Sequence, residues 1–257
     1  MNPADRIFGY MRQKPLPISS ENELFHLFFN TTVPNIALQH TIMNNILEGD
    51  GRFSYDSYNK MWYANGDDTA KNITAAEYTV IDIETTGFNP DSDKITEIAA
   101  IKIRGGEIDR HINFLVNPAR PIPLKITEIT GIRDDMVAAQ PYFRDIVPAL
   151  REFIESNILV AHHSSFDISF INAELKNAGV EPLHNITLCT CKLAKKLLPH
   201  LSSYALDSLA KNFRLTFLDR HRAYPDALVT AQVFQRFFPI FKENELQKIE
   251  HLVNLIQ

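Results

Sequence analysis

Hydrophobic and polar positions divide the chain into two parts with different periodicities. In residues 18–48, apolar side chains in ENELFHLFF and NIALQHTIMNNIL recur at the spacing of amphipathic helices. RFSYDSYNKMWYA, at residues 52–64, then alternates polar and aromatic positions around SYNK, which predicts an antiparallel hairpin. Helices followed by a hairpin predict a small winged-helix-like domain over residues 1–72. The charged, turn-rich stretch 64–72 (ANGDDTAKN) is the expected linker.

A second pattern begins at Glu77, where β-rich runs are followed by alternating helices and strands. YTVIDIE, ITEIAAIKI and RHINFLV predict three sequential antiparallel strands. NILVAHH and NITLCT predict two short strands among helical segments such as FDISFINAELKNAG and YALDSLAKNF, and FKENELQKIEHLVNLIQ predicts a terminal helix. This order predicts an α/β domain over residues 73–257, with helices flanking a mixed five-stranded sheet.

Composition and charge narrow the class of protein. Hydrophobic residues make up 45% and charged residues 22% of the 257 positions, the balance of a globular protein. The first residues lack the apolar core of a signal peptide, and no apolar run approaches a membrane span, so we expect a cytoplasmic protein without membrane contact. The two cysteines, Cys189 and Cys191, have too few partners for a structural zinc site and are expected to be reduced thiols.

The charge distribution bears on contact with nucleic acid. The net charge of −5 argues against non-specific coating of nucleic acid, although divalent cations at an acidic site reverse the local charge. Residues 190–225 are locally basic, with Asp207 and Asp219 as the only acids. The basic residues there are Lys192, Lys195, Lys196, Lys211, Arg214, Arg220 and Arg222. They form either a surface for a phosphate backbone or a solvated helix face.

Asp82 and Glu84 are the first candidate catalytic residues. Side chains two apart on a strand point to the same face, so both carboxylates leave an otherwise apolar strand together. Burial of two unpaired carboxylates is unfavourable, and their repulsion raises at least one pKa. A hard cation such as Mg²⁺, which prefers oxygen ligands, relieves both effects. Asp-x-Glu is a weak signal by itself.

Two later segments add an acid each, and one of them adds a histidine. Asp167 opens a helix directly after a strand, where the alternative is an acid that the helix dipole favours. Pro225 fits the first position of another helix, which puts Asp226 in its first turn and His221 on the preceding loop. A histidine that titrates near neutrality can take a proton from water, and the alternative is a surface histidine beside a helix start.

Together these residues resemble the DEDDh family of 3′–5′ exonucleases, and more closely the proofreading (epsilon) subunits of bacterial DNA polymerase III. The resemblance covers roughly residues 77–236 through VIDIETTGFNP, VAHHSSFDISF and HRAYPDA. It implies an RNase H-like fold and hydrolysis with two divalent metal ions, Mg²⁺ or Mn²⁺. By the same resemblance, His221 is the general base and the metal ligands are Asp82, Glu84, Asp167 and Asp226. The implied products are nucleoside 5′-monophosphates released from the 3′ end of DNA.

Substrate contacts are expected beside these motifs. The candidates are Thr85, Thr86, Gly87, Phe88, Thr130, His162 and Phe166. Phe88 either stacks on the terminal base or packs on the core. Thr130 either binds a phosphate or sugar or caps its own turn, and His162 is either a family histidine or a satisfied core histidine. His163 departs from the family, which usually has asparagine there.

Other functions remain open at this point. An exoribonuclease is the alternative within enzymes, since the same catalytic set trims RNA in related families. A catalytically idle nucleic-acid-binding module is the alternative outside them, and the presence of all five catalytic residues speaks against it. About 75 residues before the first motif favour a stand-alone or repair-associated enzyme over a dedicated proofreader. Residues 1–72 hold eight acids and six basic residues, so we expect them to contact a protein partner or position substrate rather than bind DNA.

Overall fold

The chain forms two units. The computed structural model describes residues 3–12, 18–29, 36–48, 50, 53–56, 60–64, 71–216 and 220–256. The first unit comprises residues 1–72 together with 248–257, and the second comprises residues 73–247. The second domain is predicted to run to residue 257, whereas residues 248–257, which include α11 (Ile249–Ile256), group with the first unit in the structure. Most of the predicted linker, residues 65–70, lies outside the described residues.

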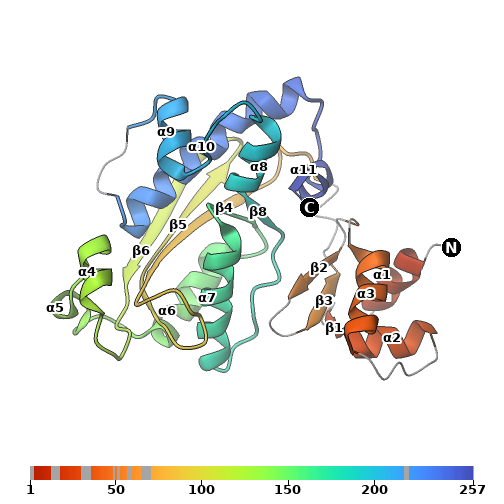
Figure 1. Cartoon of the computed structure of the whole chain (residues 1–257), viewed down its shortest axis with the longest axis horizontal. Coiled ribbons are helices and arrows are strands. Elements are labelled where there is room, and N and C mark those ends of the chain that lie inside the picture. Colours follow the sequence, from red (N-terminus) through yellow and green to blue (C-terminus); the bar gives the residue numbers. More distant parts are fainter. Residues whose placement is uncertain are drawn as a thin grey trace. The chain divides into compact units, whose positions relative to one another are not determined.

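The described part of the first unit has the element order of a winged helix (Figure 1). Its elements are α1 (Pro3–Arg12), β1 (Ile18–Ser20), α2 (Glu21–Phe29), α3 (Ile36–Leu47), β2 (Phe53–Asp56) and β3 (Met61–Ala64). The strands are antiparallel in the order β1-β3-β2, which confirms the predicted hairpin. The sequence pattern missed α1, and it assigned β1 to a helix because three residues are too few to establish an alternation.

The second unit is built on the predicted mixed five-stranded sheet, which confirms the fold class. Its strands are β4 (Tyr78–Thr85), β5 (Ile95–Arg104), β6 (Glu107–Leu115), β7 (Ile158–Ala161) and β8 (Thr187–Cys189). They lie in the order β6-β5-β4-β7-β8, with antiparallel pairing up to β4 and parallel pairing beyond it. Gly105 and Gly106 both have positive φ, which the tight turn between β5 and β6 requires.

Helices cover both faces of this sheet (Figure 1). Those that contact its strands are α6 (Phe143–Ile154), α7 (Ser164–Asn177), α8 (Thr190–Leu197) and α10 (Ala223–Glu243). The other helices of this unit are α4 (Leu124–Thr130), α5 (Asp134–Val137) and α9 (Leu206–Asn212). Ile81 and Ile83 pack with α6 and α7 in one core. Tyr78 packs on Phe234 of α10, with ring centroids 4.9 Å apart. Because strand side chains alternate, Asp82 and Glu84 lie on the α10 face with Tyr78.

The segment predicted as one terminal helix, FKENELQKIEHLVNLIQ, contains the end of α10 and, after a break, the whole of α11 (Ile249–Ile256). The chain leaves α10 at Asn244 and turns through Glu245, which has φ 58, before α11 begins. Within the described ranges, no helix combines the length and the apolar character that crossing a bilayer requires.

Candidate active site

Three of the five predicted catalytic side chains converge at one place on the sheet. Asp82 and Glu84 lie on β4, and Asp226 lies in the first turn of α10. Each offers a carboxylate oxygen, and these three oxygens lie within 4.8 Å of one another. The tertiary fold thus joins the first and last acidic motifs into one group.

The start of α10 differs in detail from its prediction. The helix begins at Ala223 with Arg222 as its N-cap, so Pro225 is its third residue rather than its first. The first-turn N–H groups of a helix have no intrahelical acceptor, so proline is accommodated there as well. His221 precedes the helix with φ 60, as expected for a loop residue, and its N–H donates to Oδ2 of Asp226 at 3.3 Å.

Asp167 is the fourth predicted acid and is buried against the same strand. It lies in the first turn of α7 with 3% of its surface exposed. Burial raises its pKa well above the usual range, the backbone amides of Asp167 itself and Ile83 oppose the rise, and the charge of Glu84 adds to it. Asp167 is not part of the three-oxygen group, but its charge contributes to the raised pKa of Asp82.

Burial acts on every acid of this centre, and repulsion by neighbouring carboxylates adds to it at Asp82 and Glu84. Both effects raise the pKa of Asp82, where burial is the larger cause and Asp167, Asp226 and Glu84 follow. Burial, followed by the charges of Asp226 and Glu97, raises the pKa of Glu84 to about 8, while Arg222 opposes the rise. Burial also raises the pKa of Asp226, against the hydrogen bond from His221.

These carboxyl groups fit divalent cations. Oδ1 of Asp226 is buried and accepts no hydrogen bond from the described part of the chain, so it has a lone pair for another partner. The donor set consists of carboxylate oxygens, which suit Mg²⁺ and Mn²⁺ better than softer metals. A bound dication also supplies the positive charge that the repelling carboxylates lack.

Glu97 is a residue of this region that the sequence analysis missed. It lies on β5 directly opposite Glu84 and is fully buried. Its carboxylate accepts hydrogen bonds from Nε and Nη2 of Arg222 at 2.8 and 2.9 Å, from the N–H of Ala223 at 3.1 Å, and from Asn113 at 3.0 Å. Burial favours a higher pKa for Glu97, but these hydrogen bonds outweigh it and lower the pKa.

Glu97 therefore ties β5 to the residues that start α10, directly ahead of Asp226. The only signal in the sequence was an acid inside the apolar run ITEIAAIKI. An acid at such a position needs a buried partner. Its partner, Arg222, is 125 residues away in the chain, a distance at which sequence spacing carries no information.

The turn after β4 presents Phe88 to solvent. Phe88 is 73% exposed, so the alternative that it packs on the core is wrong. The hydroxyl of Thr85 donates to the carbonyl of Gly87, and that of buried Thr86 accepts from the N–H of Lys94 at 3.0 Å. A Cβ on Gly87 would lie 2.3 Å from Oδ2 of Asp93, so a larger residue there would displace the Asp93 carboxylate from its hydrogen bond with the N–H of Asn89.

The other predicted substrate residues have contacts within the protein. Thr130 is buried, and its hydroxyl donates to the carbonyl of Ile126 at 3.0 Å and accepts from the N–H of Ile132 at 3.1 Å. These contacts fit the alternative that Thr130 caps its own turn. Phe166 packs on Phe170 at the edge of the core. His162 is half-buried, with Nδ1 2.9 Å from the hydroxyl of Thr190.

Part of the predicted basic surface is used in ion pairs. Arg222 binds Glu97 and Arg220 pairs with Asp207, while Asp219 lies outside the described residues. The remaining basic residues are exposed: Lys192, Lys195, Lys196, Lys211 and Arg214. A smaller basic surface than predicted is therefore available to a phosphate backbone.

Sequence comparisons give relatives for the region that carries this centre. A profile of the family described as Exonuclease matches residues 79–234. The DNA polymerase III subunit epsilon of Aquifex aeolicus is 37% identical over 163 residues, which cover 63% of this chain and 81% of that protein. The PolC-type DNA polymerase III of Clostridium perfringens is 41% identical over 167 residues, which cover 65% of this chain but only 12% of that protein.

Solved structures show the same fold. Exonuclease X in complex with 5′ overhanging duplex DNA matches with a TM-score of 0.57 and 28% identity, covering 70% of this chain and 99% of that one. Exonuclease I of E. coli in complex with a dT13 oligonucleotide matches with a TM-score of 0.60 and 16% identity, covering 66% and 42%, and so shows the fold alone. The family match spans every residue from Asp82 to Asp226, and the chain therefore belongs to the exonuclease family and is a nuclease.

Proposed function

We propose that this nuclease removes nucleoside 5′-monophosphates one at a time from the 3′ end of DNA, with two divalent cations, Mg²⁺ or Mn²⁺, as cofactors. The observation that carries the proposal is the group of carboxylate oxygens from Asp82, Glu84 and Asp226 within 4.8 Å of one another. The choice of DNA rests on the relatives, since the similar epsilon subunit belongs to a DNA polymerase and the similar Exonuclease X was solved with DNA.

The acids have distinct positions relative to the cations they would hold. Asp82, Glu84 and Asp226 would ligate them directly, and Asp167, buried beside β4, would support the second ion. When bound, such ions stabilise the negative charge that develops on a phosphodiester during in-line displacement. The raised pKa values of the carboxyl groups imply that ion binding displaces protons from this centre.

His221 is the proposed general base. It lies on the bend before α10, and its own N–H holds the carboxylate of Asp226. The imidazole and the carboxylate are therefore carried by one short segment, and the charge of His221 lowers the pKa of Asp226, which supports a base close to the acidic centre. In that position the imidazole can accept a proton from the attacking water. Phe88, exposed on the turn after β4, would stack on the terminal base, whichever base it is.

The test compares matched 5′-labelled single-stranded DNA and RNA oligonucleotides with Mg²⁺ or Mn²⁺. We expect stepwise shortening of the DNA from its 3′ end, loss of activity in Asp82→Asn, and little change in Asp109→Asn, an exposed acid on β6. His221→Ala should slow the reaction strongly and remove the acidic limb of the pH–rate profile. Full activity in Asp82→Asn would overturn the metal assignment, and much faster digestion of RNA would overturn the choice of DNA.

The role of the winged-helix unit stays a prediction. On α3, the exposed positions Ala37, Leu38, Thr41 and Asn45 carry no basic side chain. A helix with this face offers no charge for phosphate, which agrees with the expectation that the unit contacts a protein partner or positions substrate.

A further inference from the structure

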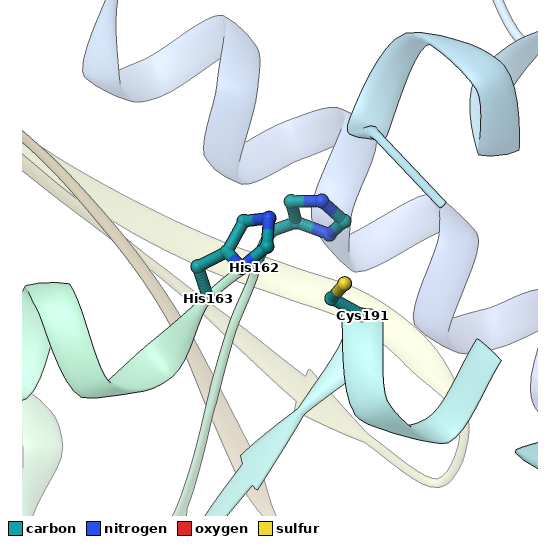
Figure 2. A group of neighbouring side chains, drawn as sticks. All are labelled: His162, His163 and Cys191. Atoms are coloured by element: carbon teal, nitrogen blue, oxygen red, sulfur yellow. The ribbon is translucent and has the colours of Figure 1, made fainter. Parts of the chain in front are cut away.

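We propose that His162, His163 and Cys191 form a second metal site, separate from the acidic centre, that binds zinc. Figure 2 shows the three side chains gathered at one point, with the imidazoles coming from the end of β7 and the N-cap of α7 and the thiol from the start of α8. One ligand atom from each lies within 4.8 Å of the other two. None of the three belongs to the carboxylate set.

His162 has a buried ring nitrogen, Nε2, that is available to a metal ion in one of its two tautomers. Its Nδ1 lies 2.9 Å from the hydroxyl of Thr190, and that hydroxyl donates to the carbonyl of Ala161 at 3.3 Å. In the tautomer that has the proton on Nδ1, the ring donates to this hydroxyl and Nε2 carries the lone pair that a metal ion would bind. Nε2 is buried without a hydrogen bond of normal geometry, although the backbone of Tyr204 lies close enough to influence the ring.

The tautomer with the proton on Nδ1 is the one that metal-ligating histidines use when they bind through Nε2. Such a histidine donates its second ring N–H to a fixed acceptor, which sets the tautomer and the orientation of the ring. The imidazole must also be neutral. Burial, followed by the charge of His163, lowers the pKa of His162 to about 4, so the ring is neutral at physiological pH.

The backbone of His163 brings the second imidazole to the same place. Adjacent side chains of an extended chain point in opposite directions. His163 instead has φ 65 and ψ 46, a left-handed conformation that non-glycine residues rarely adopt. As a result its ring stands against that of His162, with centroids 4.8 Å apart. The exposed His163 leaves one side of the site open to solvent, where a water can complete the coordination.

Cys191 gives the site its preference for zinc. Its thiol is free and 4% exposed, and burial, together with the neighbouring Cys189, raises its pKa. A metal ion that binds the sulfur therefore displaces one proton, which is released to the buffer. Two imidazole nitrogens and a thiolate suit Zn²⁺, whereas Mg²⁺ prefers oxygen. In a tetrahedral zinc site neighbouring ligand atoms lie about 3.5 Å apart, so small side-chain rotations complete the geometry.

The experiment uses Co²⁺ as a spectroscopic probe of the full chain, followed by Zn²⁺. A thiolate bound to Co²⁺ gives a near-ultraviolet charge-transfer band, and the acidic centre, which contains no sulfur, cannot produce it. We expect this band in the wild type, its loss on addition of one equivalent of Zn²⁺, and release of one proton per zinc. The band should be absent in Cys191→Ser and persist in Cys189→Ser, which removes the neighbouring buried thiol.

A second variant tests the site independently, in case Cys191→Ser does not fold. His163→Asn changes an exposed side chain, so the fold should persist, while zinc affinity should fall at least about tenfold. Thermal melting and circular dichroism check the fold of each variant. Absence of the band in the wild type, an unchanged band in Cys191→Ser, or its loss only in Cys189→Ser would each overturn the proposal.

Discussion

Glu97→Gln is predicted to slow hydrolysis although it changes none of the proposed metal ligands. The carboxylate is fully buried and accepts hydrogen bonds from Arg222, Ala223 and Asn113. Glutamine keeps the shape but offers one acceptor oxygen and one amide nitrogen that only donates. The glutamine NH₂ group would then face a donor where the carboxylate oxygen now accepts one, either the guanidinium of Arg222 or the N–H of Ala223 at the start of α10.

The size of the effect follows from these contacts. Removing one partner of a buried ion pair costs about 3–5 kcal/mol. The side chain of Arg222 is 33% exposed, so water compensates in part and we expect a loss of about 2–3 kcal/mol in the free energy of unfolding. Ala223 starts the turn that carries Asp226. A displacement of that turn by about 1 Å would lower kcat roughly 100-fold.

The assay measures kcat and KM for single-stranded DNA at saturating Mn²⁺, with thermal melting of the same samples. Glu174→Gln is the matched control, because Glu174 is also buried and its carboxylate accepts hydrogen bonds from Nζ of Lys94 and the N–H of Ile95, both at 3.4 Å, rather than from the residues that start α10. We expect kcat to fall in Glu97→Gln and to stay near the wild-type value in Glu174→Gln. A kcat for Glu97→Gln within about threefold of wild type would refute the positioning argument.

Three further predictions concern the metal-free centre and the turn after β4. In EDTA, the melting temperature should fall as the pH rises from about 5 to about 9. The pKa of Glu84, raised to about 8 by burial and by Asp226 and Glu97, makes the folded state bind more protons than the unfolded one, and that stabilisation is lost as the pH passes this pKa. Saturating Mn²⁺ should flatten the curve, and a melting temperature that rises with pH in EDTA would contradict the reasoning. Gly87→Ala should lower the melting temperature and raise KM, since its Cβ would lie 2.3 Å from Oδ2 of Asp93; scanning calorimetry and initial rates measure both. Phe88→Ala should leave the melting temperature unchanged, because the ring is 73% exposed, but raise KM for short oligonucleotides about tenfold through loss of stacking; an unchanged KM would exclude the contact.

Periodicity in the sequence predicted the strands of the second unit well. Each of β4, β5 and β6 carries its own apolar pattern over at least eight residues, and β4 shows the two acids on one face. Short elements gave weaker signals. β1 has three residues and takes its strand conformation from pairing with β3, and a local sequence pattern does not predict that pairing.

The motifs identified the candidate catalytic residues, but they did not identify the residues that hold them in position. Asp82, Glu84, Asp167, His221 and Asp226 were all visible as residue types at defined places on strands and helix starts. Thr130 was also visible, and only its two hydrogen bonds within the chain favour a capping role. For Phe88, only the exposed surface in the folded chain excluded packing on the core.

Local sequence patterns predict which segments form helices and strands, because backbone preferences and the period of apolar side chains act over a few residues. The sequence placed Asp82 and Glu84 on one side of a strand before any packing was considered. Packing of the folded chain is what brings Asp226 to that pair and joins Glu97 to Arg222 across 125 residues. It is also what groups α11 with the first unit. Contacts of this kind depend on how the layers pack and on which partners the buried charges meet. The packing and electrostatic free energies that decide this depend on the whole fold, so no local pattern predicts them.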